Sequence, residues 1–203
     1  MCIVEDSTGN LWIGTTEGLN EFDRKTGVFR RYLYSSHSEN SIPNNYITDL
    51  HVDRFNNVWI ATRKGISKYV KSEDKFYNLL IGEGIYTDGL PAMVSTFYED
   101  KSGNIWIGSY SSGLFMISHE ANLKHSSNTD NSLIIDKHWL PINKEDGRQQ
   151  NYAVQQICEY DENTLLIGKI DGLYLFNRKT EIFSQIDLVN DVCYSISLIC
   201  REN

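Results

Sequence analysis

The side chains that could perform chemistry are scattered along the chain rather than grouped into a motif. No His-Glu-x-x-His pattern is present, so the five histidines do not resemble a zinc enzyme site. The sequence also lacks a glycine-rich phosphate loop and a Gly-x-Ser-x-Gly nucleophile elbow. We therefore expect no catalytic residue, no metal site and no cofactor.

One acidic residue recurs, at Asp6, Asp53 and Asp100. Carboxylates are ligands for calcium, but the spacing around these aspartates does not follow a calcium loop. An aspartate in front of a tight turn can instead accept hydrogen bonds from backbone N–H groups. We favour this turn role over a calcium site.

The candidates for ligand contact are aromatic, basic and amide side chains. Trp139, Arg148 and Tyr152 lie in or beside an irregular segment near residues 119–150. An indole face can stack on the C–H surface of a sugar, and an arginine can bond to its hydroxyl groups. The alternative is that Trp139 only anchors this segment on the fold. Further candidates lie in expected loops, where function concentrates: Arg63, Tyr110, Tyr86 and Asn45.

These side chains would be positioned by an internal repeat. DSTGNLWIGTTEGL begins at Asp6, DRFNNVWIATRKGI at Asp53 and DKSGNIWIGSYSSGL at Asp100, and a weaker copy, DENTLLIGKIDGL, begins at Asp161. In the first three copies the Trp recurs every 47 residues, at Trp12, Trp59 and Trp106. In the fourth copy Leu166 takes this position after 60 residues, and the surplus falls in the segment after Ser118. A fixed period of this kind is the signature of a repeat architecture.

Each repeat unit reads as four short strands joined by hairpins. In the second unit the expected strands are 46–53, 58–62, 66–70 and 75–79. The period of two within the strands excludes helical repeats, and four strands in about 47 residues favour a propeller blade over a solenoid or an open sandwich.

The recurring positions suit the packing of such blades. The aromatic or leucine side chain would be buried between neighbouring blades, as structural core rather than ligand platform. It is held by Trp12, Trp59, Trp106 and Leu166. A small residue two places later leaves room near the centre, and it is held by Gly14, Ala61, Gly108 and Gly168.

We therefore predict an all-β fold of four four-stranded antiparallel blades. The expected units are 1–45, 46–92, 93–152 with an insertion at 119–150, and 153–194. Residues 195–203 align with the first strand of a further blade, because Ile196, Ile199 and Glu202 match Ile47, Leu50 and Asp53. This orphan inner strand predicts a fragment of a larger propeller rather than a closed ring of four.

The composition and net charge of the chain disfavour some classes of function. A hydrophobic content of 40% and a charged content of 23% are typical of a globular chain. The net charge of −8 disfavours binding to nucleic acid. The four cysteines show no metal spacing, and Cys193 and Cys200 could pair if the chain is exported.

The repeat resembles that of the two-component regulator propeller family. The shared pattern is Asp-x-x-Gly-Asn-Leu/Ile-Trp-Ile-Gly-Thr/Ser, then Gly-Leu, then an aromatic residue, and the segment SIPNNYITDLHVD from Ser41 is a further match. The resemblance covers residues 1–118 and 151–203. The third copy departs from it with Met116 and Ile117 at the aromatic position, and the fourth with Leu166 and a shorter turn.

This resemblance implies a function that the residues alone do not. Such repeats form seven-bladed propellers in the extracytoplasmic, periplasmic sensor region of hybrid two-component histidine kinases. It implies a non-catalytic sensor fragment, a homodimeric receptor whose remaining blades complete the propeller, and an oligosaccharide ligand from polysaccharide breakdown. An interaction or dimerisation scaffold without a ligand site is the main alternative, and a propeller enzyme is a third.

Overall fold

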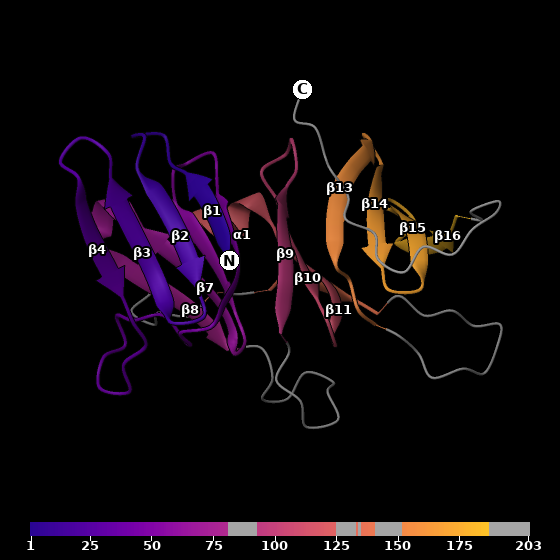
Figure 1. Cartoon of the computed structure of the whole chain (residues 1–203). Helices are drawn as coiled ribbons and strands as arrows, with labels where there is room; N and C mark the ends of the chain where they lie inside the picture. The colour runs from indigo at the N-terminus through magenta and orange to yellow at the C-terminus, as the bar shows by residue number, and fades with distance from the viewer. Residues whose placement is uncertain (81–92, 125–132, 134, 141–151, 187–203) are drawn as a thin grey trace.

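The computed structural model describes residues 1–80, 93–124, 133, 135–140 and 152–186 (Figure 1). The strands in these ranges form four separate four-stranded antiparallel sheets, in each of which neighbouring strands are consecutive in sequence. A meander of this kind is the sheet of a propeller blade. The prediction of an all-β fold with four blades is confirmed.

Each blade has an inner strand, two middle strands and an outer strand. Blade 1 contains β1 (Cys2–Glu5), β2 (Leu11–Thr15), β3 (Gly18–Asp23) and β4 (Val28–Tyr32). Blade 2 contains β5 (Ile47–Val52), β6 (Val58–Thr62), β7 (Gly65–Val70), the short helix η1 (Lys71–Glu73) and β8 (Lys75–Leu80). Blade 3 contains β9 (Val94–Glu99), β10 (Ile105–Ser109), β11 (Gly113–Ile117), α1 (His119–Lys124) and β12 (Lys137–Trp139). Blade 4 contains β13 (Gln156–Asp161), β14 (Thr164–Lys169), β15 (Gly172–Asn177) and β16 (Ile182–Gln185).

The inner strands of successive blades lie next to one another, with β5 between β1 and β9, and β9 between β5 and β13. Thr48 Oγ1 donates a hydrogen bond of 2.6 Å to the carbonyl of Val94, and Ser95 Oγ donates to the carbonyl of Val154. The centre is crowded, since a Cβ on Gly108 would lie 2.8 Å from a methyl carbon of Val154. The small residues of the repeat therefore allow the inner strands to meet.

The repeated aspartate ties each turn to the buried Trp. In blade 2, Asp53 Oδ1 accepts hydrogen bonds from the backbone N–H groups of Phe55 and Asn57, at 3.0 and 2.9 Å. Its Oδ2 accepts a bond of 3.0 Å from Trp59 Nε1. The same indole bond joins Asp6 to Trp12 at 3.1 Å and Asp100 to Trp106 at 2.8 Å. The structure thus gives these aspartates the turn role.

Blade 4 contains a reduced form of this arrangement. Leu166 replaces the Trp, and Asp161 is exposed and accepts a backbone hydrogen bond of 2.8 Å from Asn163. Because the leucine side chain has no N–H group to satisfy, this turn requires no buried carboxylate.

Each Trp is buried against the following blade. Trp12 and Trp59 are fully buried and Trp106 is 3% exposed. Trp12 packs with apolar residues of blade 2, Trp59 with those of blade 3 and Trp106 with those of blade 4. The main core therefore lies in the three interfaces between the blades.

The segment after Ser118 contains structure that the repeat pattern did not indicate. Helix α1 follows β11, and the buried Lys68 of blade 2 donates to the carbonyl of Asn122, at 2.9 Å, and to its Oδ1, at 2.5 Å. Strand β12 then pairs with β11, with Trp139 opposite Leu114. This segment thus contributes the outer strand of blade 3. The expected orphan strand at 195–203 lies outside the described residues.

Removing a buried turn aspartate should destabilise the fold far more than removing its exposed counterpart. In Asp100→Ala the indole N–H of Trp106 and two backbone N–H groups lose their acceptor, which should cost about 3 kcal/mol. Asp161→Ala removes an exposed carboxylate and is the matched control, for which we expect a much smaller loss. Urea denaturation of the two variants measures the difference, and equal losses would contradict the proposed role of the aspartate.

The buried Asp6 should also make stability depend on pH. Burial raises the pKa of its carboxyl group, but hydrogen bonds from Thr8, Lys71 and Trp12 outweigh this and hold the pKa well below its ordinary value of 3.8. Asp6 therefore stabilises the fold fully above about pH 4, and this contribution is lost as the pH falls toward the lowered pKa.

The free energy of unfolding of the native chain should accordingly fall between about pH 4 and pH 2 by more than that of Asp6→Asn. Glu39→Gln, at an exposed carboxylate, is the control and should leave the pH profile unchanged. Parallel profiles for the native chain and Asp6→Asn would rule out this role of Asp6.

Candidate functional site

One end of the blades gathers most of the loops in which ligand contact was predicted. The turns β2–β3, β6–β7, β10–β11 and β14–β15 lie there, as does the connection from β4 to β5 (lower side of Figure 1). We call this the loop end. The turns that carry the aspartates lie at the opposite end, because the strands of each blade are antiparallel.

Two of the predicted residues, Arg63 and Asn45, lie at the loop end beside the connection between blades 1 and 2. The guanidinium carbon of Arg63 lies 3.7 Å from the ring centroid of Tyr46, and the Arg63 N–H donates to the Tyr46 carbonyl at 3.3 Å. The preceding residue, Asn45, accepts a hydrogen bond of 2.7 Å from the N–H of Tyr34 through Oδ1. The ammonium of Lys64 lies 6.0 Å from the Tyr34 ring. We call these five residues the basic–aromatic cluster.

The cluster combines features that suit a polar ligand with flat apolar faces. Tyr34 is 47% exposed, and Arg63 and Lys64 are also exposed. Exposed aromatic faces can stack, and cationic groups over such faces are held in place by attraction to the ring. Sequence reasoning selected Arg63 and Asn45 but missed the two tyrosines, although Tyr46 directly follows Asn45 in the sequence.

Tyr110 lies at the same end, one blade further on. It is 40% exposed in the β10–β11 turn, and its N–H donates a hydrogen bond of 2.9 Å to the carbonyl of Met93. Ser109 Oγ shapes this turn by accepting bonds from the N–H groups of Ser111 and Ser112. Tyr110 is therefore displayed from a rigid turn.

Blade 4 places a buried lysine at its loop end. Lys169 ends β14 at the position of Thr15, Thr62 and Ser109, and it is 2% exposed. Burial lowers the pKa of its ammonium below the ordinary value, against the attraction of Asp171, whose Oδ2 lies 3.3 Å away. The ammonium also lies 4.3 Å from the ring centroid of Tyr174. The repeat pattern gave no sign of this residue, because the other blades carry a hydroxyl group there.

Trp139 lies in the interface between blades 3 and 4. Its ring stacks on Trp106 with centroids 5.4 Å apart, and it meets Phe176 edge-on at 5.1 Å. Its Nε1 donates a hydrogen bond of 3.1 Å to Glu181. These are the contacts expected if Trp139 anchors the irregular segment on the fold, which was the alternative to ligand contact. Tyr152 is half-buried just before β13, and Tyr86 and Arg148 lie outside the described residues.

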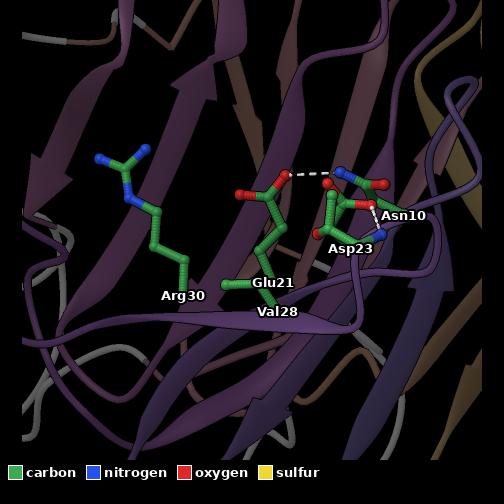
Figure 2. A pocket seen from close by; sticks show the side chains of 6 residues that line it. Asn10, Glu21, Asp23, Val28 and Arg30 are labelled. Atoms are coloured by element: carbon green, nitrogen blue, oxygen red, sulfur yellow. Dashed lines mark hydrogen bonds between the residues drawn. The ribbon is translucent and has the colours of Figure 1, made fainter.

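A surface hollow of about 290 Å³ lies on blade 1, and none of the predicted ligand residues lines it. Figure 2 shows Asn10 donating to Glu21, a bond of 2.9 Å, while Arg30 extends away from them. Glu21 also accepts from Lys71 and from Tyr32, and Arg30 pairs with Asp74 of blade 2 at 3.0 Å. The charged groups here thus link blades 1 and 2.

The repeat units match a known family. The sequence profile described as the two component regulator propeller matches residues 1–17, 41–64 and 89–111. The first three repeat units are thus similar to two-component regulator propeller repeats. The matched segments contain the inner strands and Trp turns of blades 1 to 3, whereas blade 4, with Leu166, is not matched.

Solved structures share the propeller fold of these regulator repeats. Two extracellular domains of hybrid two component systems from B. thetaiotaomicron align with TM-scores of 0.69 and 0.68, at 20% and 21% identity. They cover 91% and 92% of this chain, which spans 24% of each of them. Virginiamycin B lyase from Staphylococcus aureus aligns with a TM-score of 0.64 at 12% identity, over 92% of this chain and 55% of the enzyme.

The chain therefore spans about a quarter of the length of these extracellular domains. No curated protein sequence matches it. Among the described residues, no helix is both long enough and apolar enough to cross a membrane.

Trp139 should contribute to stability, in contrast to an aromatic residue displayed at the loop end. Trp139→Ala removes the stacking on Trp106 and should lower the free energy of unfolding by about 2 kcal/mol. Tyr110→Ala removes an exposed ring and should change it by less than about 0.5 kcal/mol. Urea denaturation measures both changes in the free energy of unfolding. A Trp139→Ala variant as stable as the native chain would show that these contacts contribute no stability.

Proposed function

We propose that the chain is part of an extracytoplasmic sensor domain of a hybrid two-component receptor. The observation that carries this proposal is the set of regulator propeller repeats, whose profile matches three segments of the chain. The fold shared with extracellular domains of hybrid two component systems supports it. The rest of the receptor would supply further blades, a membrane span and a histidine kinase. The part that contains this chain would lie in the periplasm, and the full receptor would be a homodimer.

The proposed ligand is an oligosaccharide from polysaccharide breakdown, bound at the loop end. The basic–aromatic cluster supports this site, because it offers an exposed tyrosine face, a guanidinium held over a second tyrosine, and a lysine. Binding would favour one of two arrangements of the receptor, and this difference in affinity would be the signal. The proposal contains no catalytic step, although one protein of the same fold is a lyase.

The binding site can be tested by titration calorimetry with acidic oligosaccharides from polygalacturonan and neutral ones from xylan and mannan. If one set binds the native chain, Tyr34→Ala and Arg63→Ala should each weaken the affinity at least about tenfold. Tyr160→Ala is the matched control, because this tyrosine is 62% exposed on β13 but lies near the opposite end. Affinity that is unchanged in both cluster variants would refute the cluster as the site.

Incubation of the same oligosaccharides with the chain distinguishes a sensor from an enzyme. Chromatography of the oligosaccharides after long incubation should recover them intact, since we propose binding without reaction. Shortened or unsaturated products that depend on the chain would overturn the non-catalytic proposal.

A second candidate is an interaction scaffold without a ligand site of its own. The exposed apolar residues on blade 1, including Ile3 and Phe29, favour this alternative. Binding of an oligosaccharide to the loop end, abolished by the cluster variants, would favour the sensor. A receptor that responds to an oligosaccharide while this chain binds none, and that loses dimerisation when these blades are altered, would favour the scaffold.

A further inference from the structure

The basic–aromatic cluster offers a ligand hydrogen-bond donors and few acceptors. The Oδ1 of Asn45 is already occupied by the N–H of Tyr34, at 2.7 Å, so its amide has only Nδ2 left to donate. Within the described residues, the guanidinium of Arg63 and the ammonium of Lys64 form no hydrogen bond to the protein, and both groups can only donate. Apart from the tyrosine hydroxyls, the polar side-chain groups left for a ligand are therefore donors.

The two cations of the cluster also lack a counter-charge. Other exposed cations of the chain pair with carboxylates, as Arg30 does with Asp74 at 3.0 Å. In the part of the chain that the structure describes, no carboxylate oxygen lies within 4.0 Å of Arg63 or Lys64. The whole chain has a net charge of −8, so this positive spot does not follow from a generally basic surface.

The β6–β7 turn holds Arg63 in one orientation. Thr62 Oγ1 accepts a hydrogen bond of 3.1 Å from the N–H of Lys64 and donates one of 2.9 Å to the carbonyl of Gly65, which fixes the turn. The guanidinium carbon of Arg63 lies 3.7 Å from the ring centroid of Tyr46. Stacking of this kind uses the flat face of the guanidinium and leaves the N–H groups at its edge for a ligand.

Such a site discriminates between charged and neutral sugars. A carboxylate or a sulfate group only accepts hydrogen bonds, and its oxygens match the planar fork of a guanidinium. A neutral sugar has hydroxyl groups that both donate and accept, and it gains no charge attraction from the two cations. The exposed ring of Tyr34 offers an apolar face to the pyranose ring of either kind of sugar.

We propose that the ligand of the basic–aromatic cluster is an anionic oligosaccharide. Arg63 would bind its acidic group through the edge of the guanidinium, and Lys64 would add a second positive charge. This inference rests on the proposed sensor function and narrows the class of its ligand. The carboxylate of a uronic acid and a sulfate ester offer the same chemistry here, and the probes below separate them.

The first test compares sugars that differ only in charge. A galacturonate trimer and its full methyl ester have the same rings and linkages, but the ester carries no charge. In titration calorimetry at low salt the acid should bind at least about tenfold more tightly than the ester. The advantage should shrink as the salt concentration rises from about 0.05 M to about 0.5 M, because screening weakens attraction between exposed charges.

A second pair of probes tests sulfate as the source of the charge. A sulfated galactan oligosaccharide has no carboxylate, and its desulfated form is the neutral match. A preference for the sulfated form with no preference for the galacturonate would identify sulfate as the acidic group. The reverse result would identify a uronic acid.

Variants at the cluster should change the preference for charge. Arg63→Gln should lower the affinity for the preferred anionic probe at least about tenfold, and that for its neutral match much less. Arg63→Lys keeps the charge but removes the fork, so its affinity should lie between those of the native chain and Arg63→Gln. Lys64→Gln should weaken both the preference and its dependence on salt.

Lys25→Gln is the matched control, because Lys25 is exposed in the β3–β4 turn at the opposite end. It should bind every probe as the native chain does. Arg63 and Lys64 are exposed, so urea midpoints close to that of the native chain should show that each variant is folded.

The outcomes separate this inference from the proposed function. Equal affinity for the charged and neutral forms of both pairs, lost in the Arg63 variants, would overturn the anionic ligand and leave the sensor site in place. A preference for charge that survives in Arg63→Gln and Lys64→Gln would overturn the assignment to this cluster. Failure of all four probes and of the neutral oligosaccharides to bind would overturn the ligand site itself.

Discussion

The hydrogen bond between a buried turn aspartate and the indole N–H of a Trp is the interaction on which each of the first three blades depends. The carboxylate of Asp53 holds the turn closed through two backbone N–H groups and fixes the orientation of Trp59 through a third bond. The Trp side chain can then be buried fully, because its one polar group is satisfied. Since each Trp packs against the next blade, local turn geometry is coupled directly to the packing between blades.

That coupling also explains the distribution of charge in the interfaces. A carboxylate buried at the edge of a blade is costly unless it is hydrogen-bonded or paired. Lys71 and Arg178 provide this pairing from the following blade, and Asn122 of α1 provides a polar contact where blade 3 has no cation. Blade 4 has Leu166 and an exposed Asp161, so the requirement for a carboxylate and the requirement for its partner disappear together.

The fold was predictable from the sequence because its determinants are local and repeated. The Trp spacing of 47 residues and the buried turn aspartates specify the sheet of the first three blades, and the small central residues recur in all four. The strand in the irregular segment was harder to predict. The three residues of β12 carry no periodic signal, and their strand conformation depends on pairing with β11. The candidate site was predicted only in part, because the contacts of Arg63 with Tyr46 and of Asn45 with Tyr34 join residues 17 and 11 positions apart in the sequence. The buried Lys169 could not be foreseen, because its burial results from packing within blade 4.

The common register of the three interfaces has a consequence for how such a protein can change. Because every interface uses the same two sides of a blade, a gene that gains or loses one 47-residue unit still encodes compatible surfaces at the new junction. The loops at the loop end lie outside these interfaces. Mutations can therefore change the loops of one blade without disturbing the packing between blades. In such a protein the interfaces between blades preserve the fold, while the loops are free to change binding specificity.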